Sequence, residues 1–187
     1  MALINLMKIW RFAGIDDSFN GNKCYIVGCV TANFYVEGFM CSEIKIDGLD
    51  STDKIISMIR RSKFREQIKC IFLNGITFGG FNVADIQRIY KETGIPVIVV
   101  LRRRPNMEEF LRVAEKLHDS EKRIRIIKRA GEIFEVNGLF VQLAGIELDN
   151  AKRYLKAATF KGKIPEALRI AHLAASAFVH GESKGKV

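Results

Sequence analysis

Long hydrophobic segments are missing from this 187-residue sequence, whose longest uninterrupted apolar stretch covers only residues 95–101. A helix that crosses a membrane needs about 20 consecutive apolar residues, so no membrane-spanning helix is expected. Residues 1–15 contain neither a basic amino-terminal region nor a small-residue cleavage site, and no secretory signal is expected. These absences predict a cytoplasmic protein without a membrane partner.

Proline and metal-binding side chains are also scarce. The chain has 3 prolines, 4 cysteines and 3 histidines, while 48% of its residues are hydrophobic and 27% are charged. This composition excludes a disordered, collagen-like or low-complexity chain, because enough apolar surface is available to offset the entropy of folding. The cysteines form no C-x-x-C pair and no histidine lies near them in sequence, so we expect reduced core cysteines rather than a structural zinc site.

Motifs of the common nucleotide-binding and hydrolytic folds are absent as well. The chain contains no G-x-x-x-x-G-K-[ST], no G-x-G-x-x-G and no G-x-S-x-G. The glycines at positions 75, 79 and 80 predict only a loop whose backbone can approach another group closely.

Positive charge is what the sequence has in excess. Lysine and arginine number 30 against 21 acidic residues, which gives a net charge of +9. The excess is concentrated in residues 102–129 and 152–187. Clustered basic side chains attract polyanions through long-range steering and counterion release, so nucleic acid is the favoured partner if other features agree. The alternative is a solvated face on a generally charged protein.

The first part of the chain predicts three antiparallel strands. Residues 8–15 alternate and then run apolar, and this strand is expected to end at Asp16-Asp17. Asn20-Gly21-Asn22 is a turn signal, because asparagine and glycine tolerate positive φ. Residues 23–34 and 35–46 are rich in Val, Ile, Cys and aromatic residues, as strands are.

The remainder of the chain alternates between helices and strands. Further strands are expected at residues 68–73, 95–101, 124–127, 132–136 and 139–143, the last two joined by the hairpin signal Asn137-Gly138. Helices are expected at residues 51–61, 83–92, 107–117, 147–157 and 165–179. With no repeat or linker, this order predicts one α/β domain over residues 1–187, with a mixed five-stranded central sheet of ribonuclease H-like order and a flexible tail at 180–187.

Polar side chains follow the predicted central strands, at the carboxyl ends where open α/β sheets bind ligands. Asp16-Asp17 follows the first strand, Asn74 the fourth, Arg102 to Arg104 the fifth, and Asp47 and Asp50 the third. Gathered carboxylates can hold Mg²⁺ or Mn²⁺, which activate water for phosphodiester cleavage. The alternatives are a turn at Asp16-Asp17, a helix cap at Asp50 and a solvated loop at the arginines.

The last predicted helix carries two further polar features. His172 lies within the apolar pattern of that helix, which favours a half-buried, hydrogen-bonded histidine. Glu166 and Arg169 are separated by one helical turn and are expected to pair with each other.

Five segments of the chain, taken in order, resemble those of a mainly archaeal protein family of unknown function. They are residues 47–52 (DGLDST), 73–82 (LNGITFGGFN), 93–100 (TGIPVIVV), 164–172 (IPEALRIAH) and 181–183 (GES). The resemblance covers nearly the whole chain. That family is in turn similar to endonuclease V, which has a ribonuclease H-like fold and cuts nucleic acid near deaminated adenine with Mg²⁺. The resemblance therefore implies the same fold and a related chemistry.

The first strands of endonuclease V can be placed on this sequence by their motifs. The acid that ends its first strand falls on Asp16. Its Pro-Tyr-Ile-Pro-Gly wedge falls on residues 34–38, which keep the tyrosine as Tyr35 but lack both prolines. Its second acid falls on Glu43 or Asp47.

Two later acids of endonuclease V are replaced in this sequence. Its Asp-Gly after the fourth strand falls on Asn74-Gly75, and its lysine after the fifth strand falls near Arg102 or Arg103. Its Leu-Pro-Glu-Pro-Thr-Arg-x-Ala-Asp motif falls on residues 164–172, which end at His172. With fewer carboxylates the resemblance implies weaker Mg²⁺ binding, and Mn²⁺ becomes relatively more suitable because it tolerates a nitrogen ligand.

The leading hypothesis is an endonuclease V-like, metal-dependent nuclease that acts on phosphodiester bonds of DNA or RNA. The alternatives are a non-catalytic nucleic-acid-binding module on the same fold and a scaffold whose charge serves solubility alone. The predicted catalytic residues are Asp16, Asp47, Asn74 and His172. The predicted ligands of Mg²⁺ or Mn²⁺ are Asp16, Asp47, Asp50 and Asn74. The predicted substrate contacts are Tyr35, stacking on a base, and Arg102, Arg103 and Arg169 on phosphate.

Overall fold

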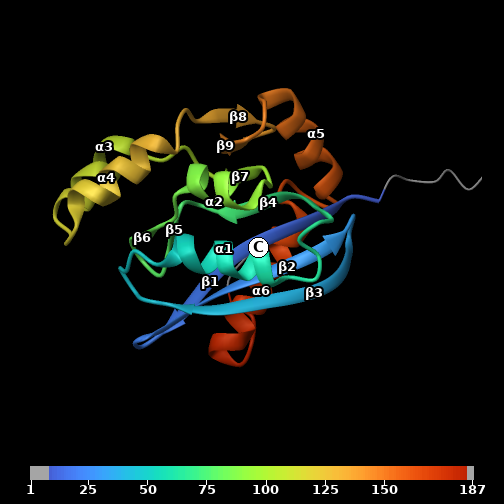
Figure 1. Ribbon diagram of the computed structural model, residues 1–187, viewed down its shortest axis with the longest axis horizontal. Helices are drawn as coiled ribbons and strands as arrows, with labels where there is room; N and C mark the ends of the chain where they lie inside the picture. Colours follow the sequence, from blue (N-terminus) through green and yellow to red (C-terminus); the bar gives the residue numbers. More distant parts are fainter. Residues whose placement is uncertain (1–8, 185–187) are drawn as a thin grey trace, which may run out of the picture.

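The computed structural model describes residues 9–184, and its first three strands form an antiparallel meander (Figure 1). These strands are β1 (Arg11–Asn20), β2 (Lys23–Ala32) and β3 (Tyr35–Ile44). Gly21, with a φ of 57°, lies in the first reversal, and Asn33, with a φ of 52°, lies in the second. The predicted meander and its Asn-Gly turn are confirmed.

One seven-stranded sheet forms the centre of the molecule, with the strand order β3-β2-β1-β4-β7-β9-β8. β4 (Ile68–Asn74) and β7 (Val97–Leu101) run parallel to β1, while β9 (Leu139–Ala144) is antiparallel to β7, and β8 (Phe134–Val136) is antiparallel to β9. The predicted mixed α/β sheet is confirmed. It has seven strands rather than the five predicted, because the β8–β9 hairpin extends the same sheet. The short strands β5 (Thr77–Phe78) and β6 (Asn82–Val83) pair separately.

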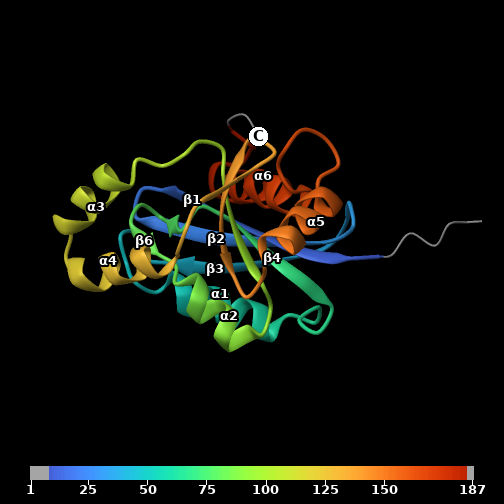
Figure 2. The same cartoon turned by 90° about the horizontal axis from the view of Figure 1, so that it is seen from above.

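Helices cover both faces of the sheet, so the fold has three layers (Figure 2). One face carries α1 (Ser51–Arg61) and α2 (Ile86–Thr93), and the other carries α5 (Leu148–Ala158) and α6 (Glu166–His180). A helical hairpin of α3 (Met107–Glu115) and α4 (Ser120–Arg129) projects to one side (Figure 1).

The central strand β4 supplies both hydrophobic cores, one under each helical layer. Its consecutive residues Ile71 and Phe72 are fully buried but belong to different clusters, because successive side chains of a strand point to opposite faces. Burying a side chain of this size contributes about 1.5–3 kcal/mol relative to its exposure to water. The uninterrupted apolar run of residues 70–73 within β4 is thus what a strand covered on both faces requires.

The strand predicted at residues 124–127 is wrong, because these residues lie within helix α4. Arg123 and Ile127, four positions apart, are the buried residues of this helix, and Ala130 is buried just beyond it. This helical spacing outweighs the β-branched isoleucines, whose strand preference depends on the surface available for packing.

β1 continues past the point where the sequence predicted its end. Its parallel pairing with β4 stops at Ile15 opposite Leu73, but its antiparallel pairing with β2 continues to Asn20 opposite Lys23. Asp16 is therefore not at the end of its strand. It is the first residue of β1 beyond the parallel ladder, next to Asn74 at the end of β4.

The carboxyl-terminal helix is followed by a segment that folds back onto it. The Ser183 hydroxyl donates to the Leu173 carbonyl over 2.9 Å, and the Lys184 amide donates to the Ser176 hydroxyl over 2.8 Å. The flexible tail at 180–187 stays a prediction, and residues 185–187 lie outside the described part of the chain. Among the residues described, no helix has the length and apolar character needed to cross a membrane.

Candidate active site

Asp16 is the centre of a polar cluster built by three elements that are distant in sequence. Its Oδ2 atom accepts a hydrogen bond from Asn74 Nδ2 over 3.0 Å and another from His172 Nδ1 over 2.7 Å. Its Oδ1 atom accepts from the Asp17 backbone amide over 2.9 Å. Asp16 is only 3% exposed, so β1, β4 and α6 hold one buried carboxylate in a fixed position.

The position of His172 follows from the close approach of α6 to β1. A Cβ atom at Gly14 would lie 2.2 Å from the backbone of Ala167 and Leu168, so only glycine lets the helix pack this closely. Buried side chains of α6, among them Leu168 and Ala171, lie against the sheet. His172 is partly exposed beside this face and contacts Asp16, as expected for a half-buried, hydrogen-bonded histidine.

The electrostatics of the pair favour a charged imidazole. The hydrogen bond to Asp16 raises the pKa of His172 above its usual value, and the carboxylate charge acts in the same direction. Burial and the positive charge of Arg102 lower this pKa, which places Arg102 within electrostatic range of the site. The other ring nitrogen, His172 Nε2, is buried without a hydrogen-bond partner among the residues described.

Asp17 points to the opposite face of the sheet from Asp16 and has a different role. Its Oδ2 atom accepts from the Gly79 backbone amide over 2.8 Å and lies 3.8 Å from the thiol of Cys24. The pKa of Asp17 is raised to about 6, chiefly by burial and in smaller part by the neighbouring Asp16 charge, against the lowering effect of the Gly79 hydrogen bond. Asp17 thus attaches the glycine loop to β1, and its charge contributes only a minor rise to the pKa of His172.

Within residues 9–184, no hydrogen bond or ion pair joins the acidic residues after β3 to Asp16, although the Asp47 amide donates to the carbonyl of Gly79, whose own amide donates to Asp17. The register explains this, because Asp16 pairs with Val27 and Val27 pairs with Cys41, so Cys41 is the β3 residue level with Asp16. β3 continues to Ile44, and Asp47 follows beyond its end.

Asp47, Asp50 and Glu43 instead have local surroundings of their own. Asp47 is exposed, and its Oδ1 atom accepts from the Phe81 amide over 2.8 Å. Asp50 Oδ1 accepts from the amide of Lys45 and, over 2.7 Å, from Asn82 Nδ2. Asp50 precedes α1 without capping it through its side chain, and Glu43 is an exposed residue of β3.

The donors around Asp16 fit a divalent cation only in part. Asp16 offers a carboxylate and Asn74 an amide oxygen, both hard ligands, while His172 would offer a nitrogen, which Mn²⁺ tolerates better than Mg²⁺, only as a neutral imidazole. A half-turn of the exposed Asn74 amide would place its oxygen beside Asp16. Over residues 9–184, however, no three His, Cys, Asp or Glu side chains are grouped to hold a metal ion. This donor set fits a weakly held cation with water completing its coordination.

The predicted substrate contacts are spread along the molecule. Arg102 and Arg103 are exposed just after β7, near the site. The guanidinium of Arg169 is engaged by Glu166 through two hydrogen bonds of 2.9 and 2.6 Å, so the predicted pair across one turn forms. Tyr35 is 82% exposed at the start of β3, far from Asp16 along the sheet.

A model of the family described as endonuclease dU matches residues 8–179 of this sequence. The chain belongs to this family. Its relatives include a UPF0215 protein from Archaeoglobus fulgidus, which is 59% identical over 180 residues that cover 96% of this chain and 99% of the relative. The resemblance to an archaeal family is thereby confirmed.

Solved structures place this member of the family in a known fold. The crystal structure of a protein of unknown function from Archaeoglobus fulgidus matches with a TM-score of 0.90 and 59% identity, covering 92% of this chain and 99% of that one. Endonuclease V from Ciona intestinalis, in complex with a 24mer DNA containing an inosine followed by a ribo-adenosine, matches with a TM-score of 0.57 and 15% identity. This second match covers 89% of this chain and 84% of that one, and confirms the endonuclease V-like fold alone.

One important residue of this endonuclease dU family member was not found from the sequence. Arg123 is 3% exposed, and its guanidinium donates to the carbonyl oxygens of Asp47, Gly48, Phe81 and His118. It therefore fixes the turn that follows β3 and the loop that follows the glycines. In the sequence it is one of many cations in residues 102–129, so no local signal separates it from the solvated ones.

Proposed function

We propose that this protein is an endonuclease that cleaves phosphodiester bonds of nucleic acid at the site centred on Asp16. One observation carries the proposal: three elements place donors on one buried carboxylate beside the carboxyl end of the parallel strand β4. The family description, endonuclease dU, and the fold of a DNA-bound endonuclease V support a nucleic-acid substrate. Arg102 and Arg103 supply positive charge beside the same strand end for a phosphate.

The residues of the site divide the work. Asp16 and the Asn74 oxygen would hold Mg²⁺ or Mn²⁺, which supplies a polarised phosphate and an activated water when bound. His172 donates the proton on Nδ1 to Asp16 Oδ2 and so keeps the carboxylate correctly oriented. Asn74 holds the same oxygen from the other side. Such preorganised donors cost no reorganisation during the reaction.

The second candidate function is a nucleic-acid-binding module without catalysis. It is favoured by the hydrogen bonds that already occupy both Asp16 oxygens and by the lack of a three-ligand acidic cluster within residues 9–184. In this case the basic surface alone would act, with Arg102 and Arg103 on phosphates. Replacing both arginines by alanine should then lower the slope of log affinity against log salt by up to about 0.9 per lost phosphate contact on duplex DNA.

A cleavage assay decides between the two functions. The substrates are labelled DNA and RNA oligonucleotides that contain deoxyuridine, inosine or only ordinary bases, with Mg²⁺, Mn²⁺ or a chelator. We expect metal-dependent cleavage by the wild type, none by Asp16→Asn, and wild-type rates from Asp149→Asn, because Asp149 is exposed on α5. Salt-dependent binding with no cleavage under any condition would overturn the endonuclease and leave the binding module.

A further inference from the structure

The loop between α5 and α6 brings an exposed aromatic ring to the β2–β3 turn. Phe160 is 70% exposed, and its ring centroid lies 5.0 Å from that of Phe34, with the planes tilted by 47°. Phe34 precedes Tyr35, which is 82% exposed. We call Phe34, Tyr35 and Phe160 the aromatic platform. It joins two segments that are far apart in sequence.

The turn that carries the platform is held firmly in place. The Asn33 amide donates to the Trp10 carbonyl over 2.7 Å, and the Trp10 amide donates to Asn33 Oδ1 over 2.9 Å. The Trp10 ring packs edge-on against Tyr154 of α5 at 4.9 Å. Contiguous exposed apolar surface on a fixed scaffold marks an interaction site, because exposure to water is unfavourable and no flexibility relieves it.

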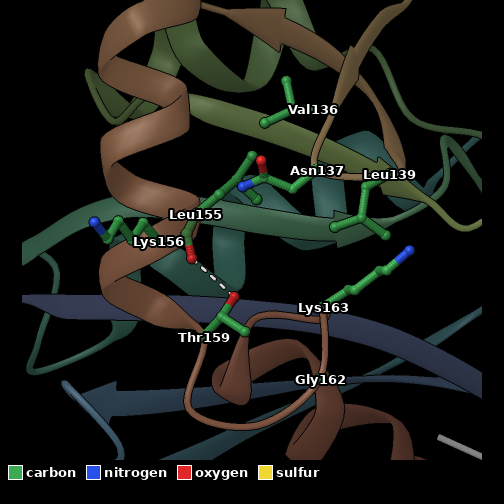
Figure 3. Close-up of a pocket in the computed structure, with 8 residues that line it drawn as sticks. All are labelled: Val136, Asn137, Leu139, Leu155, Lys156, Thr159, Gly162 and Lys163. Atoms are coloured by element: carbon green, nitrogen blue, oxygen red, sulfur yellow. Dashed lines mark hydrogen bonds between the residues drawn. The ribbon is translucent and has the colours of Figure 1, made fainter.

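The same loop closes a cavity of about 200 Å³ together with α5 and the β8–β9 hairpin. In Figure 3 the ammonium groups of Lys156 and Lys163 lie on opposite sides of the cavity. The other lining residues are Val136, Asn137, Leu139, Leu155, Thr159 and Gly162. None of these is acidic, so the rim of the cavity is positively charged.

The position of Lys163 and its lack of an ion-pair partner among the residues described suit the binding of an anion. Its ammonium lies against the hairpin turn, where a Cβ atom on Gly138 would be only 2.5 Å from Nζ. Within residues 9–184, neither Lys156 nor Lys163 has an ion-pair partner, and the adjacent Lys161 is exposed and also unpaired. The loop therefore carries unpaired cations one and three residues after the exposed ring of Phe160.

Aromatic rings interleaved with unpaired cations fit single-stranded nucleic acid, since bases stack on the rings while phosphates meet the cations. The location is also suitable. Tyr35 pairs with Ala32, and Ala32 pairs with Arg11, so the platform is level with the start of β1. Asp16 lies five residues further along β1, about 17 Å at about 3.4 Å per residue. A nucleic-acid strand that reaches Asp16 can continue over the aromatic platform.

We propose that the α5–α6 loop is a binding site for single-stranded nucleic acid. Phe160 stacks on an unpaired base, and Lys163 holds a phosphate at the cavity. The inference rests on the proposed nucleic-acid substrate but concerns binding away from Asp16, so it can fail while the cleavage site stands.

Binding of a labelled single-stranded oligonucleotide in the presence of a chelator tests the proposal without cleavage. Phe160→Ala should weaken affinity by roughly 5- to 150-fold, from about 1–3 kcal/mol per stacked base. Lys163→Gln should lower the salt slope by about 0.7. The matched controls are Phe178→Ala, on a ring that is 62% exposed at the far end of α6, and Lys63→Gln, beside α1 on the other face. Both controls should bind as the wild type does.

Equal affinity of Phe160→Ala and wild type, with an unchanged salt slope in Lys163→Gln, would overturn the site. An equal loss in the Phe178→Ala control would also overturn it, because the effect would then not be local. If the wild type binds and cleaves normally and these substitutions have no effect on binding, only this inference fails. If the wild type binds neither single strands nor duplexes, the inference and the proposed function fall together. Thermal melting of each variant verifies that it is folded.

Discussion

The imidazole Nδ1 of His172 lies 2.7 Å from the Oδ2 atom of Asp16, although 156 positions separate the two residues in sequence. This contact joins the last helix to the first strand at the candidate site. It also occupies a carboxylate oxygen that a metal ion would otherwise use. The balance between internal hydrogen bonds and cation binding at Asp16 is therefore the property that substitutions should change.

Asn74→Asp should lower the stability of the metal-free protein and raise its affinity for a divalent cation. It removes the 3.0 Å hydrogen bond to Asp16 and sets two carboxylates side by side, so the metal-free protein should lose about 1–3 kcal/mol of unfolding free energy. Millimolar Mg²⁺ or Mn²⁺ should raise the melting temperature of this variant more than that of the wild type, because the ion binds only the folded state. Asn150→Asp, at an exposed position of α5, is the control and should show neither effect.

Gly14→Ala should separate α6 from the sheet. The added Cβ would meet backbone atoms of Ala167 and Leu168 at 2.2 Å, and backbone cannot move aside as a flexible side chain can. We expect a loss of about 1–3 kcal/mol or more in urea unfolding, together with lost cleavage because His172 is displaced. Gly28→Ala is the matched control, since its Cβ would meet side-chain atoms rather than backbone, the nearest being the flexible end of Met40 at 2.8 Å. Equal stability of the two variants would contradict the close packing of α6.

Arg123→Met should destabilise the protein strongly even though no carboxylate is lost. The methionine would leave up to four carbonyl oxygens without their donor, and each buried unsatisfied group costs about 1–3 kcal/mol. Chemical denaturation should show a loss of several kcal/mol. Arg125→Met, an exposed position of the same helix, should remain within about 0.5 kcal/mol of the wild type.

The pair of Glu166 and Arg169 should give a pH-dependent contribution to stability. The hydrogen bond from Arg169 lowers the pKa of Glu166 below its usual 4.5. A carboxylate whose pKa is lower in the folded than in the unfolded protein stabilises the fold at pH values above its unfolded-state pKa. This stabilisation disappears as the pH falls through its folded-state pKa. Arg169→Met should therefore cost about 0.5–1 kcal/mol at pH 7, a modest figure because Arg169 is partly exposed. The difference from wild type should shrink as the pH falls below 4.5 and vanish once Glu166 is protonated in the folded protein, and a constant difference at all pH values would refute the linkage.

Much of the fold could be predicted because the hydrophobic periodicity and the turn-forming residues of each segment indicate the same element. The Asn-Gly signals at Gly21 and Gly138 and the apolar run of β7 each specified an element by short-range physics. The isoleucines of α4 led to a wrong strand prediction. Which of them is buried depends on the loops that Arg123 contacts, and not on the local sequence. Tertiary contacts decide such segments, and a local pattern does not contain them.

The candidate site was predictable only where sheet neighbours supply it. Asp16 and Asn74 each come directly after the last residue pair of the parallel β1–β4 ladder, so their meeting comes from topology alone. Asp47 could not be placed, because the length of β3 and the turn held by Arg123 determine how far it lies from Asp16. The platform at Phe160 left no signal, since a lone aromatic residue in a loop has no periodicity to interpret.

The continuation of β1 beyond Asp16 affects how the protein loses structure. Residues Asp16 to Asn20 remain paired with β2, so the carboxylate belongs to the body of the sheet rather than to a strand terminus. Local opening of proteins starts at termini and loops, whereas central strands exchange their amide protons only on global unfolding. The Asp16 amide should thus be among the slowest to exchange. The centre of the candidate site would persist, heated or partly denatured, until the whole domain unfolds.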